Sequence, residues 1–595
     1  MSEQSVTAAV PFGPHVLREY ALLADGERGA LVGPRGDISW LCVPRWESDA
    51  VFSSLVGGPG CFAVTPEDRF VWGGQYETGS LIWRSRWVTQ HGITECREAL
   101  ALPADPHRTV ILRRVRPEDS DAAVRVVLQA SAGFGRHKLQ RIRRQDPGVW
   151  TARTGPLYLR LSGADAVRPG GLGHPDDVLA GLLRVSSGDH HDLVLEISDQ
   201  PLPDDPPDPD RTWRSTEQCW AADVPRLSGT LADRDAVHSY AVLRGLTSSG
   251  GGMVAAASMS LPERADQGRN YDYRYVWIRD QCFAGQAVAV AVGADRLLDG
   301  AVAFVSERVR ADGPDLRPAY TTTGGSVPEQ RQLDLPGYPG GYDIAGNQVT
   351  HQFQLDTLGE ALLLFAAAAR HDHLDADGWR AAETAADAIA ARWEDPEAGI
   401  WELDDRLWTE SRLICVAGLK AICAVGAPAH RMTDWMALAD KILAQASATS
   451  VHPGGWWQRA PDDSRIDAAL LLPPLRGALP FDDPRTVATV HQVEAELGED
   501  TFLYRFRQQP GPLANAEGAF LLCGLVMALA KHQQGSDLEA VRWFERNRSA
   551  CGPPGLYSEE YDVHQRQMRG NLPQAFVHAL FLEAAARLAE PWSGR

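Results

Sequence analysis

The chain has 595 residues and a formal net charge of −20, with 58 Lys and Arg against 78 Asp and Glu. An acidic balance of this size argues against a nucleic-acid partner or an anionic membrane surface, because both select basic patches. The length exceeds what one core usually supports, and a composition with 44% hydrophobic residues is typical of globular proteins, so we expect at least two folded domains.

The nine cysteines are scattered, and none forms a C-x-x-C pair. Several lie in apolar stretches, for example Cys415, Cys423 and Cys523, which predicts reduced, buried thiols in a cytoplasmic protein. The first 30 residues lack a basic segment followed by a long apolar one, so no secretory signal is expected. No apolar run reaches the roughly 18 residues that cross a bilayer. We therefore expect no membrane partner and a substrate that is found inside the cell.

The first 200 residues have a β-type pattern, in which apolar residues recur with a period near two between Gly, Pro and Asp clusters. This pattern predicts an antiparallel β-sandwich domain over 1–200. The clearest candidate strands are 80–88, 109–116, 124–130 and 191–198. The following stretch, 201-PLPDDPPDPD-210, is too rich in proline for a helix or a central strand, so we interpret 201–232 as a linker.

Residues 233–595 have helical periodicity, which predicts a large all-α domain. Several candidate helices are apolar on nearly every side, which indicates burial on more than one face and favours paired helices closed into a toroid. The candidates are 233–247, 280–293, 347–371, 376–393, 410–426, 432–446, 515–533 and 572–589.

One segment before a predicted helix, 270-NYDYRYVWIRDQ-281, holds four aromatic residues, two arginines and two aspartates. Aromatic faces stack on sugar rings, and Arg and Asp side chains hydrogen-bond to vicinal hydroxyls, so this composition suits a sugar pocket. A structural aromatic cluster with an Arg–Asp ion pair fits the composition equally well.

A second segment, 394-EDPEAGIWELDDRLWTESR-412, places Glu402 directly after Trp401 in an acidic loop. A carboxyl group packed against an indole is partly desolvated, which raises its pKa and suits a general acid at a glycosidic oxygen. The alternative is a solvated acidic loop, and the other acids of the segment fit that alternative.

A third segment, 556-LYSEEYDVHQRQMRGNLPQAFVHA-579, has two adjacent glutamates, Glu559 and Glu560, before the last predicted helix. One of them could be the ionised base that activates water, and capping or ion pairing at the helix entry is the alternative. Together, the three segments fit a glycosidase, which needs carboxyl groups on both sides of the scissile bond.

Other chemistries lack their motifs. The sequence has no G-x-x-x-x-G-K-[ST], no H-E-x-x-H and no G-x-S-x-G. The histidines at 190–191 and in 371-HDH-373 lie in polar or helix-end surroundings and are expected to be solvated. We therefore expect no metal and no cofactor.

These residues resemble glycoside hydrolase family 15, which contains glucoamylases, glucodextranases and bacterial trehalases. The resemblance covers nearly the whole chain, and its first part looks like the N-terminal domain of the trehalase-like branch. It is carried by 29-GALVGPRGDISWLCVPRWESDAVFSSLVGG-58, by 270-NYDYRYVWIRD-280, by 399-GIWEL-403 with Thr409-Glu410-Ser411-Arg412, and by 558-SEEYD-562 with 570-GNLPQAFVHA-579.

The resemblance implies a β-sandwich followed by an (α/α)6 barrel, and hydrolysis with inversion from the non-reducing end. By the family pattern Glu402 is the general acid and Glu559 is the general base. Inversion leaves room for water between the two carboxyl groups, which places them roughly 6.5–9.5 Å apart. The resemblance also implies a set of substrate-binding residues, namely Tyr273, Trp277, Arg279, Asp280, Trp401 and Glu560.

The sequence departs from the family pattern on the side of the pocket where the leaving group is expected. The segment 337-GYPGGYDIAGN-347 lacks the usual basic residue and has Asp343 nearby, and Leu403 follows the predicted acid. Tyr271 and Val276 stand where the family usually has Trp and Cys.

A small α-glucoside is thus the expected substrate, with trehalose favoured and malto- or isomalto-oligosaccharides next. A glycoside phosphorylase is the main alternative, which the second glutamate at 559 disfavours, and a sugar-binding protein without catalysis is another.

Overall fold

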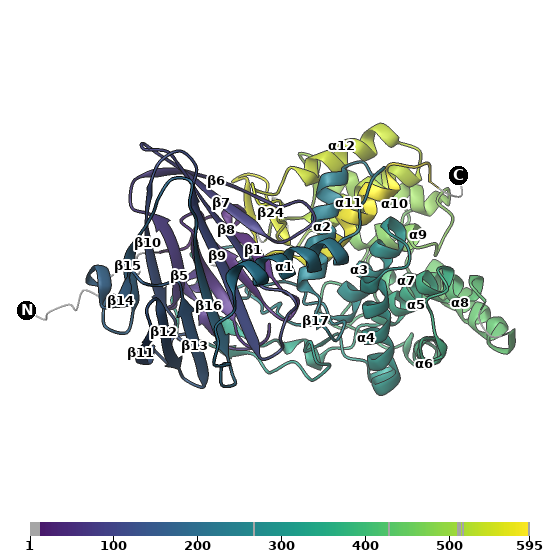
Figure 1. The fold of residues 1–595 in the computed structure, drawn as a ribbon. Helices are drawn as coiled ribbons and strands as arrows, with labels where there is room; N and C mark the ends of the chain where they lie inside the picture. Colours follow the sequence, from purple (N-terminus) through teal and green to yellow (C-terminus); the bar gives the residue numbers. More distant parts are fainter. Residues whose placement is uncertain (1–11, 266–267, 427–428, 509–512, 514–516, 593–595) are drawn as a thin grey trace, which may run out of the picture. The chain divides into compact units, whose positions relative to one another are not determined.

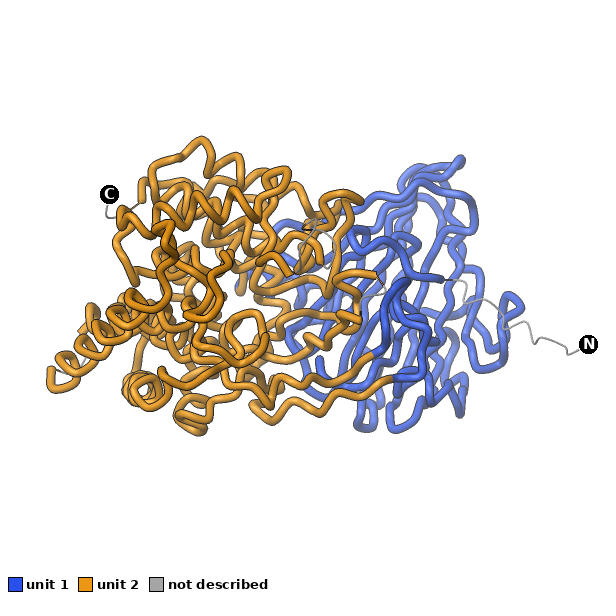
Figure 2. The backbone as a smooth tube through the Cα atoms, turned by 180° about the vertical axis from the view of Figure 1, so that it is seen from behind, with its two compact units in different colours: residues 1–222, 333–343 blue, residues 223–332, 344–595 orange. Residues whose placement is uncertain are grey.

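The computed structural model describes residues 12–265, 268–426, 429–508, 513 and 517–592. The chain divides into two compact units (Figure 2). Unit 1 comprises 1–222 and 333–343, and unit 2 comprises 223–332 and 344–595. The short return of 333–343 to unit 1 was not expected from the sequence, because nothing in its local composition distinguishes it from a loop of the helical half.

Unit 1 contains two antiparallel sheets (Figure 1). The first has the order β1 (Ala21–Ala24), β2 (Gly29–Val32), β3 (Asp37–Cys42), β5 (Cys61–Pro66), β10 (Ala122–Gln129), β15 (Leu179–Val185), β14 (Val167–Pro169), with β4 (Ala50–Phe52) paired to β3. The second has the order β11 (Gln140–Asp146), β12 (Val149–Thr154), β13 (Leu157–Ser162), β16 (His191–Ser198), β9 (Arg108–Pro117), β8 (Ile93–Leu100), β7 (Trp83–Thr89), β6 (Phe70–Tyr76).

Strand β7 shows how the sequence pattern produces the sandwich. Trp83, Ser85 and Trp87 are buried, whereas Arg84 and Arg86 between them face outward. Alternate side chains of a strand point to opposite faces, so this period of two sends the indoles into the core. The predicted strands 80–88, 109–116, 124–130 and 191–198 are confirmed, with small shifts at their ends.

Within 201–232, which we expected to be a linker, the structure has helix α1 (Pro209–Asp223). Proline is tolerated in the first turn of a helix, where its missing N–H would have no partner. Asp208 Oδ1 accepts a hydrogen bond from Arg211 N at 2.8 Å and so caps this start. The helix buries Trp213 and Trp220, so the proline-rich stretch begins a helix instead of excluding one.

Unit 2 consists of helices that alternate along the chain between an outer and an inner position. The inner elements contact one another in a closed ring, in the order α3, α5, α7, η6 with α9, α11, α13 and back to α3. Their bounds are α3 (Ile278–Ala291), α5 (Asp356–Arg370), α7 (Thr409–Ala424), η6 (Ala468–Leu471), α9 (Leu472–Leu475), α11 (Leu521–Gln533) and α13 (Ala575–Arg587). The outer helices are α2 (Asp233–Leu246), α4 (Arg296–Asp312), α6 (Ala376–Arg392), α8 (Ala429–Thr449), α10 (Pro484–Leu497) and α12 (Asp537–Arg548).

The inner helices are buried on nearly all sides, as their uniformly apolar sequences predicted. Two glycines allow α5 and α7 to approach closely. A Cβ on Gly359 would lie 2.8 Å from Cys415 N, and one on Gly418 would lie 2.5 Å from Gly359 O. The ring confirms the predicted toroid of paired helices.

Two predicted helices begin too early. The helix expected over 347–371 is split into a 3-10 turn, η5 (Gln348–His351), and α5. Asn347 Oδ1 accepts from Val349 N at 2.9 Å, which caps the short turn and separates it from α5. The helix expected over 515–533 begins at Leu521, because Ala519–Phe520 forms strand β23, and 515–516 lie outside the described residues.

Short strands connect to the first residues of the inner helices. Strand β17 (Val276–Trp277) pairs with β18 (Ala319–Tyr320) just before α3. Strand β23, just before α11, pairs with β24 (Glu560–Asp562), which pairs with β25 (Gln567–Arg569) ahead of α13. Smaller pairs join β19 (Arg331–Gln332) to β20 (Ile344–Ala345) and β21 (Gly498–Glu499) to β22 (Phe502–Leu503).

All nine cysteines lie in the described residues, none of them forms a disulfide, and seven are buried, as predicted. No helix in the described parts of the chain combines the length and apolar character needed to cross a bilayer.

Candidate active site

A cavity of about 270 Å³ lies in unit 2 near the first residues of the inner helices. Arg279 and Phe283 come from α3, Leu522 from α11, and Phe576 from α13. The rest of its wall comes from connecting segments, namely Glu263, Arg269, Tyr271, Tyr273, Gln330, Asn347, Gln348, Val349, Gln352, Ile400, Trp401, Glu402, Arg505, Phe520 and Glu559. The wall is rich in aromatic rings, amides and charged groups, which suits a ligand with many hydroxyls.

Glu402 reaches the cavity from the loop between α6 and α7. Its backbone adopts a positive φ of 54°, and its N–H donates to Gly399 O at 3.1 Å. The carboxylate is 27% exposed. Oε1 accepts a hydrogen bond from Trp277 Nε1 at 2.7 Å and lies 3.9 Å from Arg279 Nη2. Since Oε1 is already used as an acceptor, Oε2 is the oxygen that remains for a proton.

The indole beside Glu402 is therefore that of Trp277, whereas the sequence suggested Trp401. The Trp401 indole Nε1 donates to Asp467 Oδ1 at 2.8 Å. Its ring lies edge to face with that of Phe520, with 5.6 Å between the ring centroids. Trp401 thus forms part of the cavity wall and is held by Asp467, a residue at the start of η6.

The loop that carries Glu402 is attached to α5 through Glu397. Glu397 Oε2 accepts from Gly399 N at 2.7 Å and from Leu355 N at 3.2 Å. Burial raises the pKa of Glu397 to about 8, and the charge of Asp356 acts in the same direction. A buried carboxyl therefore fixes the base of the loop.

Arg279 is held in place by side chains from the start of α5. Its Nη1 donates to Gln354 Oε1 at 2.8 Å and lies 3.3 Å from Asp356 Oδ2. Asp280, next to it on α3, is buried, and burial raises its pKa to about 7, against the effect of the Arg279 charge.

Glu559 enters the cavity from the segment just before β24. The Tyr273 hydroxyl donates to Glu559 Oε1 at 3.4 Å, and Glu559 Oε2 has no hydrogen-bond partner among the described residues. Burial raises the pKa of Glu559 well above its usual range. The charge of Glu263 raises it further, whereas Arg505 and Arg269 oppose the shift. When ionised, this carboxylate is a strong base with a free oxygen.

A carboxylate–guanidinium cluster, formed by Glu263, Arg269, Arg505, Glu517 and Glu560, surrounds Glu559. Arg269 Nε donates to Glu263 Oε2 at 2.7 Å, and Arg505 donates to both oxygens of Glu517. Glu560 Oε2 accepts from Gly518 N at 2.7 Å.

Sequence patterns did not single out the first four members of this cluster. Glu263 and Arg269 lie only a few residues before the aromatic segment, so a wider window around that motif would have included them. Arg505 and Glu517 come from a segment with no periodicity or motif, and only the fold brings them to Glu559.

The structure brings some of the predicted site residues to the cavity wall and keeps others behind it. Tyr273, Arg279, Trp401, Glu402 and Glu559 line the cavity. The remaining three do not belong to its lining, namely Trp277, which contacts Glu402, and the buried residues Asp280 and Glu560.

The unusual segment 337–347 is divided between the two units. Residues up to Asp343 belong to unit 1, and burial raises the pKa of Asp343 to about 6. Residues from 344 onward belong to unit 2, where Asn347, Gln348 and Val349 line the cavity. Two amide residues and a valine thus form this part of the wall.

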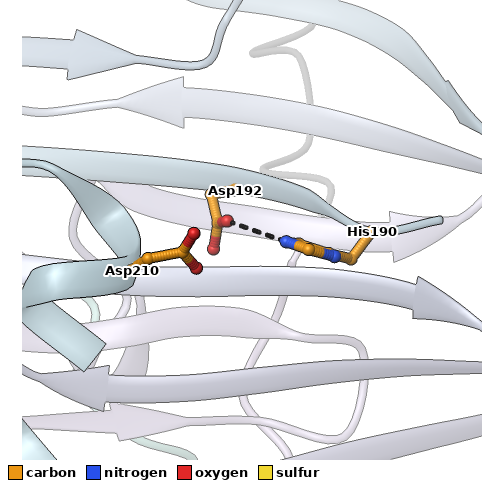
Figure 3. A group of neighbouring side chains, drawn as sticks. All are labelled: His190, Asp192 and Asp210. Atoms are coloured by element: carbon orange, nitrogen blue, oxygen red, sulfur yellow. Dashed lines mark ion pairs between the residues drawn. The ribbon is translucent and has the colours of Figure 1, made fainter. Parts of the chain in front are cut away.

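Two groups of described residues bring three potential metal ligands together. In unit 1 they are His190, Asp192 and Asp210 (Figure 3). Arg114 Nη2 lies 2.8 Å from Asp192 Oδ2 and 2.5 Å from Asp210 Oδ1, so a guanidinium already forms ion pairs with both carboxylates. His190 is 47% exposed, as the prediction of a solvated histidine requires.

The second group consists of Glu263, Glu559 and Glu560 in unit 2. Here Arg269 and Arg505 supply the positive charge beside the carboxylates. In chemical terms, the cavity offers one carboxyl held by an indole and another carboxylate with a free oxygen, both on the wall of one sugar-sized space. Proton donation and water activation are the two tasks that this pair can perform.

Comparisons with known proteins identify relatives of this chain. The family model "Glycosyl hydrolases family 15" matches residues 236–586, and "Trehalase-like, N-terminal" matches residues 13–167. A trehalase of Mycobacterium tuberculosis is 30% identical over 97% of this chain and 90% of its own length. A trehalase of Mycolicibacterium smegmatis is 28% identical over 98% of this chain and 94% of its own length.

The structures agree as well. A bacterial glucoamylase, solved in complex with acarbose, matches with a TM-score of 0.71 at 14% identity, over 98% of this chain and 95% of that one. This likeness confirms the predicted fold, a β-sandwich followed by an (α/α)6 toroid.

Proposed function

Because this chain belongs to glycosyl hydrolases family 15, we propose that it is an inverting, exo-acting α-glucosidase whose preferred substrate is trehalose. The family and its trehalase relatives make the protein a glycoside hydrolase. The observation that carries the proposed mechanism is that Glu402 and Glu559, from separate segments of the chain, line one cavity.

In the proposed reaction, Glu402 is the general acid. Trp277 and Arg279 both contact Oε1, so the carboxyl proton lies on Oε2. This proton goes to the glycosidic oxygen as the glycosidic bond breaks. The negative charge that then develops on Glu402 strengthens its hydrogen bond with the Trp277 indole, because bonds to charged acceptors are stronger than bonds to neutral ones. This contact therefore favours the transition state over the ground state.

Glu559 is the proposed general base. Its Oε2 has no partner in the described part of the chain and can accept a proton from water. Tyr273 donates to Oε1 and so fixes the orientation of the carboxylate. Attack by this water on the face opposite the leaving group would invert the anomeric carbon. We further propose that Tyr273, Arg279 and Trp401 bind the terminal glucose, and that Trp277, Asp280 and Glu560 shape the site from behind.

Trehalose is the first candidate because relatives called trehalases match nearly the full length of this chain, and a trehalase-like N-terminal model matches as well. Malto- and isomalto-oligosaccharides are the next candidates, since the fold is also that of a bacterial glucoamylase.

The first experiment tests turnover. We expect purified protein to release glucose from trehalose, and E402Q and E559Q to lose about 10²- to 10⁴-fold in kcat with unchanged circular dichroism. The matched controls are E394Q and E499Q, which change glutamates outside the cavity. Near-normal rates in both site variants would reject the assignment, and formation of glucose 1-phosphate in phosphate buffer would identify a phosphorylase instead.

We also propose that the enzyme works in the cytoplasm. None of the nine cysteines, all of which lie in the described residues, forms a disulfide, a state that a reducing compartment maintains. Cell fractionation with an antibody against the protein would test this, and recovery in the medium or the periplasm would contradict it.

A further inference from the structure

Two guanidinium groups lie near Glu559, yet each of them donates to a different carboxylate. Arg269 Nε donates to Glu263 Oε2 at 2.7 Å, and its Nη2 lies 3.5 Å from Glu517 Oε2. Arg505 donates to Glu517. Neither arginine makes a hydrogen bond or ion pair with Glu559 in the described structure. A carboxylate beside two arginines normally forms an ion pair, so this arrangement needs an explanation.

Glu263 is close enough to Glu559 for its charge to matter. One carboxylate oxygen each of Glu263, Glu559 and Glu560 lies within 4.8 Å of the other two. Glu263 and Glu559 are 3% and 5% exposed, so water screens their interaction only weakly.

The backbone fixes Glu263 in this position. Gly570 N donates to Pro262 O at 3.0 Å, and Glu263 N donates to Arg269 O at 3.1 Å. A Cβ on Gly570, which has a positive φ of 77°, would lie 3.5 Å from Glu559 Oε2 and 3.8 Å from Glu263 Cγ. A glycine therefore lies against both carboxyl side chains, and Glu263 is held there by main-chain bonds as well as by Arg269.

We propose that Glu263 is a positioning residue that acts through Glu559: by binding the Arg269 guanidinium, it prevents an Arg269–Glu559 ion pair and keeps the Glu559 carboxylate free to take a proton from water. The inference rests on the proposed function, since it takes Glu559 as the base. Glu517 has the corresponding contact with Arg505 on the other side of the cluster.

The proton balance at Glu559 depends on every charged or titratable group that faces it. Glu560 is its neighbour in the chain, Glu263, Arg269 and Tyr273 come from 263–273, and Asp280 from α3. Tyr271, Arg279 and Glu402 line the same cavity. Arg505 and Glu517 come from the segments before β23. Removing the Glu263 charge takes away a carboxylate that raises the pKa of Glu559, and it leaves Arg269 with only its 3.5 Å contact to Glu517. The pKa of Glu559 should therefore fall, and the carboxylate should become a weaker base.

The test is the dependence of kcat/KM on pH with trehalose. In E263Q we expect the acidic limb, which reports the base of the free enzyme, to move down by about 1 pH unit and the plateau to fall about 10-fold. In E263Q/R269Q we expect both to return toward wild type, because the cation that Glu263 binds has been removed too. E77Q is the matched control: it removes a carboxylate that binds Arg84 and Arg97 in unit 1, and it should leave the limb in place.

A purely structural role for Glu263 would produce a different result. E263Q would then lower thermal stability without moving the acidic limb of the kcat/KM profile. The double variant would be less stable and less active than E263Q. Either finding would overturn the proposal. If E263Q does not fold, E263D serves instead, because it retains the negative charge. Its acidic limb should stay within a few tenths of a pH unit of the wild-type position, and a displacement of about 1 pH unit would contradict the inference.

Failure of this inference is distinguishable from failure of the proposed function. Substantial activity in E559Q would reject Glu559 as the base. An inactive E559Q together with an unmoved limb in E263Q would reject only the role of Glu263.

Discussion

At the scale of single residues, the contact between Trp277 and Glu402 is the most specific feature of the proposed acid. The indole N–H donates to Oε1 at 2.7 Å. A preorganised donor stabilises the charge that forms on a general acid when its proton leaves.

Trp277→Phe should therefore slow catalysis while the aromatic ring still fills its place. We expect kcat/KM to fall about 10- to 100-fold, the effect of losing one hydrogen bond to a charged group. Trp456→Phe is the matched control, since Trp456 stacks on His452 at 4.1 Å and does not line the cavity. Steady-state kinetics on both variants measures the difference, and equal rates would show that the indole N–H has no part in catalysis.

The residue scale also shows what sequence could and could not predict. Glu402, Glu559 and Tyr273 are predicted by their motifs, and all three line the cavity. The motif points to Trp401 as the indole partner of Glu402, since adjacency in the sequence is the only proximity that a motif displays. Trp277 lies 125 positions away, and only the packing of β17 against the acid loop brings it there.

At the scale of elements, much of the site lies where the inner helices begin. Arg279 is in the first turn of α3, Leu522 in the first turn of α11, and Phe576 in the first turn of α13. The N-terminal end of a helix carries a partial positive charge and free N–H groups. Such ends favour carboxylates, which fits a cavity with several buried acids.

Glu397 joins the Glu402 loop to α5, and its ionisation should affect stability. Its pKa is raised from 4.5 to about 8 in the folded chain, mainly by burial. Between these values the folded chain keeps a proton that the unfolded chain has lost, so stability falls as the pH rises through this window. The contribution of the protonated Glu397 carboxyl to folding stability is fully present below this pH window and is lost above it.

Glu397→Gln should reduce this pH dependence. The amide oxygen can still accept from Gly399 N and Leu355 N, and it cannot ionise. We expect the urea midpoint of the variant to change less between pH 5 and pH 8.5 than that of the wild type, a difference measurable by fluorescence. Exposed Glu394→Gln should behave as the wild type does, and an equal slope in E397Q would contradict the raised pKa.

The elements themselves were largely predictable. Buried inner helices such as α7 and α13 are apolar on nearly every side, and this composition predicts both the helix and its burial. Helices α4, α10 and α12 were not among the candidates, because an amphipathic outer helix contains many polar residues and resembles a loop in composition. Helix α1 was missed because its first residue is a proline.

At the scale of the whole molecule, the two periodicities of the sequence correspond to the two units. Alternation with a period of two gives the sheets of unit 1, and helical periodicity gives the ring of unit 2. The exception is 333–343, which lies within the helical half of the sequence and belongs to unit 1. Long-range contacts decide that membership, and local propensity carries no information about them.

The central claim concerns a pair of carboxyl groups that act together on one bond, and the stereochemistry of the products tests it most directly. Proton NMR of trehalose hydrolysis, recorded before mutarotation, counts the anomers. An inverting pair predicts equal amounts of α- and β-glucose, since the attacked ring inverts and the leaving ring keeps its configuration. Release of α-glucose alone would require a covalent, retaining mechanism and would contradict the roles given to Glu402 and Glu559.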